Sequence, residues 1–285
     1  MLDTKAESEY LAFASEFSAS GTILAVRENG AFADTGTGTY LGEGWVLTAA
    51  HVVTGNRPSV TFRVGGITYS ADLTTLSLHP NYFTEGTLFN DLAVFKLTLT
   101  PPVAPALIYD GGTMLGKPVA VVGAGSSGFG STGYSPLSRL GTMRAGTNVI
   151  DGVGPGGTTL HSDFDAPAGY AYSGAGNGFA NGVPTSLESL VVPGDSGGGW
   201  YISTPTGWAL AGVSSSWTVW SGRSYGHYGD TNTAMSLPAY TGWLDSIGVN
   251  LTYASAVPEP SITALLLIAI GAVAYLKLRR QNHNL

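Results

Sequence analysis

The chain has 285 residues, a formal net charge of −7 at neutral pH and no cysteine. That length can bury a sizeable core, and the acidic balance leaves no basic surface to hold nucleic acid, which argues against such a partner. The lack of cysteine excludes disulfides, thiolate metal sites and cysteine nucleophiles. The 41 glycines suit many short strands joined by tight turns, so an all-β body is predicted.

The body is expected to begin near residue 21, after a lead-in over residues 1–20 that has no continuous apolar stretch of the secretory-leader kind. Two sets of short runs rich in β-branched and aromatic residues follow, with turn residues between them. The first set covers residues 21–26, 38–50, 59–64, 67–73, 92–97 and 117–125, and the second covers 142–150, 200–203 and 207–219. Two consecutive sets predict two antiparallel barrels or a sandwich.

Helical signals are sparse before the last fifty residues. Residues 236–249 predict one short helix, with Ser236 as its N-cap and Gly248 just past its end.

A formal G-x-G-x-x-G motif occurs at Gly123, Gly125 and Gly128. A nucleotide-binding motif of this kind needs a helix after the glycines, because the helix N-terminus faces the pyrophosphate. No helical pattern follows here, so we interpret this stretch as a loop that crosses between barrels.

Three polar residues stand in contexts that suit acyl-transfer chemistry, which needs a nucleophile, a base, a carboxylate that orients the base, and donors for an oxyanion. Ser196 lies among glycines in the stretch PGDSGGGW (193–200), and His51 follows an apolar strand and two alanines. Asp91 begins an alternating apolar strand. Taken singly, each has a structural explanation: a core histidine, a turn cap or the polar residue of a glycine-rich turn.

Together, the three contexts resemble the chymotrypsin-like serine protease family. The matching segments are TAAH (48–51), NDLAV (90–94) and GDSGG (194–198), in the family's order. The resemblance covers roughly residues 20–250. It implies two antiparallel six-stranded barrels, at about residues 21–125 and 135–250, in a protease domain over residues 21–255 that ends in a short helix.

The resemblance also implies a role for each matching residue. Ser196 would attack the scissile carbonyl, His51 would accept its proton, and Asp91 would orient the imidazole. The backbone N–H groups of Gly194 and Ser196 would form the oxyanion hole. The chain departs from the family's pattern at Gly199, where proline is usual, and in lacking a visible activation sequence; the partner of Asp195 stays open.

Specificity is expected to depend on residues before and after the nucleophile. By count, Leu190 falls at the base of the family's primary pocket, and an apolar base favours an apolar or small residue before the cleaved bond. A shift of the loop by two residues would instead place Glu188 there and favour basic side chains. In the segment 207–219, Ser215 or Ser216 would face the substrate backbone, with Trp217 near the pocket wall.

The remaining histidines show no spacing with acidic residues that suggests a metal site, so surface or loop roles are expected for them. They are His79, His161, His227 and His283. Asp163 and Asp165 lie in a stretch that could bind a structural calcium ion, the weaker of two interpretations of it. We predict no cofactor and no metal.

The C-terminal residues 256–285 change character. Pro258, Glu259 and Pro260 precede an apolar run at 262–276, and a basic cluster follows. This order resembles the PEP-CTERM sorting signal of Gram-negative bacteria, which implies an exosortase-type partner and a membrane helix over about residues 262–278. By the positive-inside rule the basic tail is expected to stay cytoplasmic. Because such a tail requires export, we expect a true start upstream of residue 1.

Our leading hypothesis is therefore a serine endopeptidase, acting on protein or peptide substrates, that is exported and sorted to the cell envelope or extracellular matrix. The alternative is a non-catalytic module in which the same barrels serve binding or adhesion at the cell surface. A lost triad member would mark the alternative, and all three are present.

Overall fold

The computed structural model describes residues 1–28, 30, 33–82, 90–136, 140–171, 182–220 and 225–254. The predicted sorting motif (Pro258, Glu259 and Pro260), the predicted membrane helix and His283 lie outside the described residues. Residues Met1–Ala254 form one compact unit. Within the described ranges, no helix is both long and apolar enough to cross a membrane.

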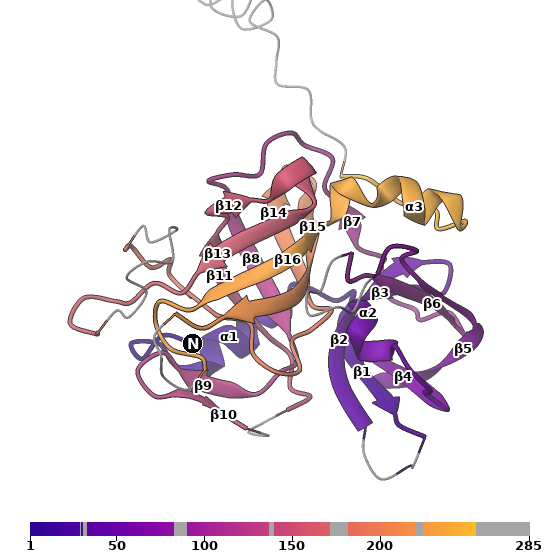
Figure 1. The fold of residues 1–285 in the computed structure, drawn as a ribbon, viewed down its shortest axis with the longest axis horizontal. Helices are drawn as coiled ribbons and strands as arrows, with labels where there is room; N and C mark the ends of the chain where they lie inside the picture. Colours follow the sequence, from indigo (N-terminus) through magenta and orange to yellow (C-terminus); the bar gives the residue numbers. More distant parts are fainter. Residues whose placement is uncertain are drawn as a thin grey trace, which may run out of the picture. The chain divides into compact units, whose positions relative to one another are not determined.

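The first set of strands closes into a six-stranded antiparallel barrel (Figure 1). Its strands pair in the order β1-β2-β3-β6-β5-β4. In β4, Val60, Phe62 and Val64 point into the core while the residues between them face outward, the alternation expected of a barrel wall. The strands are β1 (Ser20–Val26), β2 (Ala33–Gly42), β3 (Trp45–Thr48), β4 (Ser59–Val64), β5 (Ile67–Leu78) and β6 (Ala93–Leu97).

The second set forms an eight-stranded sheet, with the order β11-β8-β14-β15-β16-β13-β12 and β7 beside β15. The all-β class with a closed first barrel is thus confirmed, whereas the described strands of the second set form an open sheet. A separate hairpin joins β9 (Ser127–Phe129) and β10 (Gly133–Ser135). The sheet strands are β7 (Leu107–Ile108), β8 (Pro118–Gly123), β11 (Arg144–Val149), β12 (Gly152–Val153), β13 (Thr159–Asp163), β14 (Gly199–Thr204), β15 (Gly207–Thr218) and β16 (Thr231–Ser236).

Barrel and sheet share one hydrophobic core. The largest buried cluster extends from Phe62 and Phe95 in the barrel to Val122, Tyr201 and Val213 in the sheet. The loops that leave the two bodies are therefore held against a common packed interior, which fixes their relative positions.

The helices are short. The predicted C-terminal helix is present as a 3₁₀ turn, η2 (Leu237–Ala239), followed by α3 (Thr241–Ser246). Ser236 precedes η2 but its side chain makes no capping bond, which corrects its predicted role as an N-cap. Gly248 follows the helix with a φ of 81°. The others are α1 (Glu7–Ala14), α2 (Ala50–Val53) and η1 (Pro155–Gly157).

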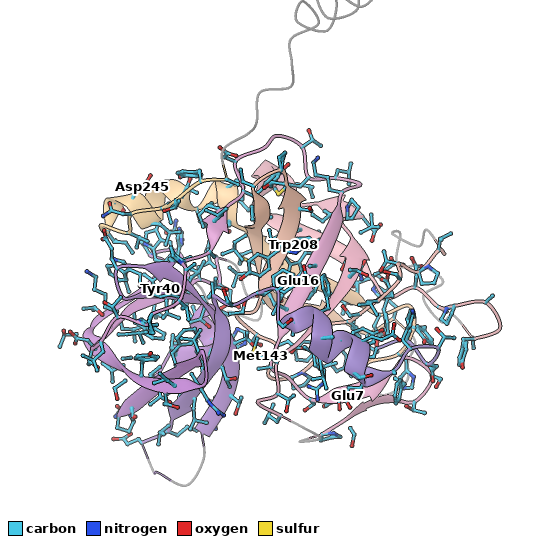
Figure 2. All side chains as sticks on the ribbon, turned by 180° about the vertical axis from the view of Figure 1, so that it is seen from behind. Glu7, Glu16, Tyr40, Met143, Trp208 and Asp245 are labelled. Carbon is cyan, nitrogen blue, oxygen red and sulfur yellow. The ribbon has the colours of Figure 1, made fainter. Side chains whose placement is uncertain are left out.

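Residues 1–20 pack on the body. Leu2, Tyr10 and Phe17 are buried, and α1 lies across the second sheet beside β11 (Figure 2). The indole of Trp208 in β15 donates to Glu16 at 2.8 Å. The N-terminal segment thus belongs to the same core as the barrels.

Candidate active site

His51 and Asp91 meet at one end of the first barrel. Strands β3 and β6 are neighbours, with Thr48 opposite Ala93, so the residues just beyond these strand ends are brought together. The imidazole Nδ1 of His51 lies 2.7 Å from Asp91 Oδ2, and the His51 backbone N–H donates to Asp91 Oδ1 at 2.9 Å. The fully buried carboxylate therefore fixes both the main chain and the ring of His51.

A third donor to the same carboxylate comes from the second sheet. The buried hydroxyl of Ser215 in β15 donates to Asp91 Oδ2 at 2.6 Å. Ser215 and Ser216, one of which is predicted to face the substrate backbone, both line the cleft that contains His51 and Ser196. The hydroxyl of Ser215 bonds Asp91, and thereby ties the barrel to the sheet at this point.

Ser196 occupies a tight turn pressed between the two bodies. Its carbonyl accepts the N–H of Thr37 in β2 at 2.8 Å, and the next N–H, from Gly197, donates to Ser214 in β15 at 2.8 Å. Gly197 has a φ of 83°, and a Cβ there would lie 2.1 Å from Thr48 Oγ1. Only glycine fits that position, because both the dihedral and the space exclude a side chain.

The backbone around Ser196 offers two free donors. Asp195 N–H donates to Val192 at 2.9 Å, whereas the N–H groups of Gly194 and Ser196 donate to no group of the described chain. Two unpaired N–H groups close to a nucleophilic hydroxyl can together bind one negatively charged oxygen.

His51 and Ser196 line a common cleft of about 810 Å³ between barrel and sheet. Among the described residues, no hydrogen bond joins the Ser196 hydroxyl to His51. Such bonds are often long in the absence of substrate and shorten when the reacting groups are engaged. Because Nδ1 is directed at Asp91, Nε2 is the nitrogen left to act on a group in the cleft.

The Asp195 carboxylate points away from this cleft, into the sheet. Its Oδ1 accepts the N–H of Gly125 at 2.7 Å and its Oδ2 that of Val192 at 2.8 Å. Burial raises the pKa of Asp195 to about 6. A Cβ on Gly123 would lie 2.0 Å from Oδ1, and one on Gly125 2.6 Å. The first two glycines of the G-x-G-x-x-G motif thus make room for Asp195, and the third, Gly128, lies in β9.

Arg144 supports the same loop from behind. Its Nη1 donates to the Gly125 carbonyl at 3.1 Å, and its Nε donates to Glu7 of α1 at 2.8 Å. The N-terminal helix is therefore linked to the Ser196 turn through Arg144, Gly125 and Asp195. Sequence reasoning missed Arg144 and Glu7, since nothing in their local context marks them. The G-x-G-x-x-G pattern does mark the glycines in the sequence, but it does not reveal that they make room for Asp195.

Gly199, the position where the related family usually has proline, begins β14. A Cβ there would lie 2.4 Å from the ring of Tyr201. Tyr201 is buried and its hydroxyl bonds Ser20 of β1 at 2.8 Å. The tyrosine fills the space that a side chain at residue 199 would need, which accounts for the glycine.

The cleft ends, beyond His51, in two arginines that share one carboxylate. Arg27 and Arg57 each place a guanidinium nitrogen 2.6 Å from Asp34. The hydrogen bond from Arg27 is the largest effect on Asp34 and lowers its pKa. The three side chains leave this end of the cleft with one excess positive charge.

The predicted specificity residues are divided between two hollows. Ser216 and Trp217 line the cleft with His51 and Ser196. Leu190 instead lines a separate enclosed cavity of about 50 Å³, and it packs in a buried cluster with Phe164. Leu190 is therefore placed outside the cleft that it was expected to floor.

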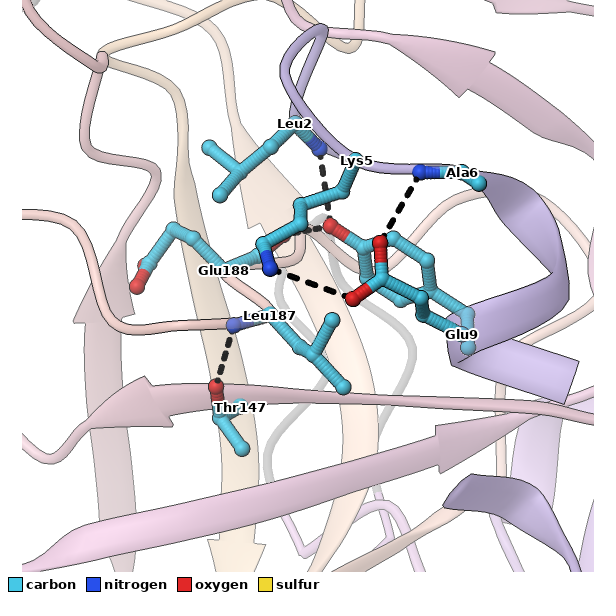
Figure 3. A network of polar contacts seen from close by, with 8 residues as sticks. Leu2, Lys5, Ala6, Glu9, Thr147, Leu187 and Glu188 are labelled. Atoms are coloured by element: carbon cyan, nitrogen blue, oxygen red, sulfur yellow. Dashed lines mark hydrogen bonds and ion pairs between the residues drawn. The ribbon is translucent and has the colours of Figure 1, made fainter. Parts of the chain in front are cut away.

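Glu188 is buried beneath the N-terminal segment. Its Oε2 accepts the backbone N–H of Thr185 at 2.7 Å, and its carbonyl accepts the Tyr10 hydroxyl at 3.1 Å (Figure 3). Burial raises the pKa of Glu188 to about 8. The side chain is consequently neutral for the most part at pH 7 and offers little charge to a basic substrate residue.

His79 and His227 lie in loops, as expected, whereas His161 lies in a strand. His161 lies in β13 and bonds Thr159 and Thr233, and His227 is buried. His79 packs edge-on against Tyr240. Across the described ranges, no group of three or more acidic or histidine side chains could hold a metal ion.

Comparisons with known proteins show which family the chain resembles. A family model described as Trypsin matches residues 19–237, and one described as the PEP-CTERM protein-sorting motif matches residues 256–281. No curated protein matches the chain. The solved structure of HL collagenase matches with 18% identity and a TM-score of 0.58, over 82% of this chain and 95% of that one. At that identity the likeness shows the fold alone.

Proposed function

Because the chain belongs to the trypsin family of serine peptidases, we propose that it is an active endopeptidase whose catalytic residues are Ser196, His51 and Asp91. The observation that carries the proposal is the His51 imidazole, held through Nδ1 by the buried Asp91 at 2.7 Å and lining the same cleft as Ser196. That arrangement leaves Nε2 available to the Ser196 hydroxyl, near which the N–H groups of Gly194 and Ser196 donate to no group of the described chain.

In the proposed acylation step, Ser196 Oγ attacks the scissile carbonyl while His51 Nε2 takes its proton. The Nδ1–H bond to Asp91 holds the tautomer that leaves Nε2 unprotonated, and the carboxylate stabilises the imidazolium once it forms. The imidazolium then gives its proton to the leaving amine. Ser215 supports this role of Asp91, since its hydroxyl donates a hydrogen bond to the buried carboxylate and holds it in place.

The developing oxyanion would be bound by the N–H groups of Gly194 and Ser196. The Asp195 side chain helps to fix the orientation of these two N–H groups, because its carboxylate accepts hydrogen bonds from Gly125 and Val192. A donor of this kind contributes about 2.7–4 kcal/mol to lowering the barrier. Deacylation repeats the sequence, with water in place of the leaving amine and His51 as its base.

The test is labelling of the full chain by a fluorophosphonate, which reacts with an activated serine. Wild type and Ser203→Ala, a control at an exposed position in β14, should label equally, and Ser196→Ala should not label. Failure of the folded wild type to label would refute the catalytic assignment and favour the non-catalytic binding module. Equal labelling of Ser196→Ala would show that a different serine is the nucleophile.

We further propose that residues 256–281, which carry the PEP-CTERM motif, direct the exported protease to the cell envelope or matrix. An exosortase-type enzyme would recognise Pro258, Glu259 and Pro260 while the apolar run 262–278 spans the membrane with its basic tail cytoplasmic. Replacement of Glu259 by Ala should retain the protein in the membrane fraction at its full length. Unchanged processing and location of this variant would contradict the proposal.

A further inference from the structure

The side chain of Tyr225 lies between β15 and the chain segment that precedes Ser196. On one side its ring stacks on Trp217 of β15, with centroids 4.3 Å apart and an interplanar angle of 30°. On the other side its hydroxyl donates to the carbonyl of Val191. Tyr134 packs edge-on against the same ring at 5.4 Å. Three contacts therefore hold the phenol in one place.

Two of the residues that hold this ring, Trp217 and Tyr134, line the hollows described above. Ser126 and Tyr134 line both the catalytic cleft and the small enclosed cavity, so the two adjoin. Trp217, on which Tyr225 stacks, lines the cleft, whereas Gly226, the next residue in the chain, lines the cavity. The phenol thus contacts Trp217 and Tyr134, which line the cleft, and Tyr134 also lines the cavity.

A bound substrate would place one residue along β15. With its carbonyl carbon at Ser196 and its oxygen at the N–H groups of Gly194 and Ser196, the preceding residue runs along β15 at Ser215–Trp217. A side chain that leaves this strand toward residues 191–193 would enter the gap between that segment and β15. Tyr225 spans that gap, from Trp217 to Val191.

We propose that Tyr225 closes the substrate pocket below Trp217 and thereby restricts the enzyme to small residues, namely Gly, Ala and Ser, immediately before the cleaved bond. The inference rests on the proposed peptidase function and replaces the weaker expectation based on Leu190. Burial raises the pKa of Tyr225 well above its usual value, so its hydroxyl stays protonated and keeps donating to Val191 at neutral pH.

In this proposal Tyr225 fills the pocket and takes no part in the reaction. Its replacement by a small residue should therefore widen specificity and leave the reacting groups in place. In Tyr225→Ala the cleft and the cavity of about 50 Å³ become continuous. Each methylene that a pocket accommodates changes kcat/KM by roughly 10- to 200-fold. We therefore expect kcat/KM for substrates with Leu or Phe before the cleaved bond to rise at least about tenfold relative to Ala substrates.

The experiment profiles full-length wild type, Tyr225→Ala and Tyr225→Phe on peptides that differ only at the residue before the cleaved bond. Wild type should cleave after Gly, Ala and Ser. Tyr225→Phe, which keeps the ring and loses the bond to Val191, should retain that preference, and only Tyr225→Ala should gain Leu and Phe. Efficient wild-type cleavage after Phe, Leu, Arg or Lys, or an unchanged profile in a folded Tyr225→Ala, would overturn the inference.

A second measurement tests the pocket without catalysis. Indole should bind Tyr225→Ala, as monitored by calorimetry, and should bind neither wild type nor Tyr225→Phe. Absence of binding to the folded Ala variant would refute this role of Tyr225. Fluorophosphonate labelling separates the two proposals: an unlabelled wild type contradicts the peptidase function alone, whereas a labelled enzyme with a preference for large residues contradicts only the role of Tyr225.

Discussion

Gly125 donates its N–H to Oδ1 of Asp195 at 2.7 Å, an approach that is possible only because Gly125 has no side chain. The contact matters because Asp195 lies between Gly194 and Ser196, the two residues with free N–H groups. A formal nucleotide-binding pattern in the sequence thus makes room for the Asp195 carboxylate beside the turn that carries Ser196.

Replacement of Gly125 by Ala should impair catalysis. The new Cβ would lie 2.6 Å from Asp195 Oδ1, so the carboxylate and the turn above it must move. Loss of one aligned oxyanion donor reduces kcat by about 10²–10³-fold, and we expect a decrease of that order in the rate of peptide hydrolysis. Gly242→Ala is the control, since nothing lies within 4 Å of its Cβ position. Equal rates in both variants would contradict the role of Gly125.

Substitution of Asp91 and substitution of Ser215 should differ in their effect on kcat. Asp91→Asn presents an N–H or a neutral oxygen to His51, which disfavours the productive tautomer, and kcat should fall by about 10⁴-fold. Ser215→Ala removes the 2.6 Å bond to Asp91 but leaves both bonds to His51, so a decrease of about 10-fold is expected. Steady-state kinetics on one peptide measures both. A larger loss in Ser215→Ala than in Asp91→Asn would contradict this order.

The link between α1 and Arg144 should contribute to stability. The Glu7 and Arg144 side chains are 20% and 10% exposed and lie 2.8 Å apart, so Glu7→Gln should lower the free energy of unfolding by about 1–3 kcal/mol. The control is Glu9→Gln on the same helix, because Glu9 pairs with Lys5 in solvent and exposed pairs contribute little. Urea denaturation measures both. Similar midpoints for the two variants would show that the link to Arg144 is not stabilising.

The contribution of Glu188 to stability should fall as the pH rises from about 4.5 to about 8, because burial raises the pKa of Glu188 from its usual 4.5 to about 8. Within that range the folded state holds a proton that the unfolded state has released, so each rise in pH favours unfolding. The stabilising contribution is complete below pH 4.5 and lost above pH 8. Asp195, whose pKa is raised to about 6, acts in the same direction at lower pH.

Urea denaturation at pH 5 and pH 8 checks this expectation in wild type and in Glu188→Gln. Glutamine keeps an oxygen that can accept from Thr185 and cannot titrate, so the variant should lose less stability between the two pH values. Parallel decreases in the two proteins would exclude Glu188 as the source.

Several features could be read from the sequence because their signals are local. A strand that ends in two small residues and His51, an aspartate that opens an apolar strand, and a serine among glycines each depend on a few neighbours in the chain. The alternation of β4 and the turn residues between strands are local in the same way, so the all-β class was predictable.

Tertiary packing decided the rest, since it joins residues that no short pattern relates. Ser215 reaches Asp91 across 124 positions, and Gly125 meets Asp195 across 70. Counting back from Ser196 placed Leu190 at the pocket floor, yet a count gives only the position along the chain. Which side chain fills a hollow depends on how distant segments pack around it, as in the contacts of Tyr225 with Trp217, Val191 and Tyr134.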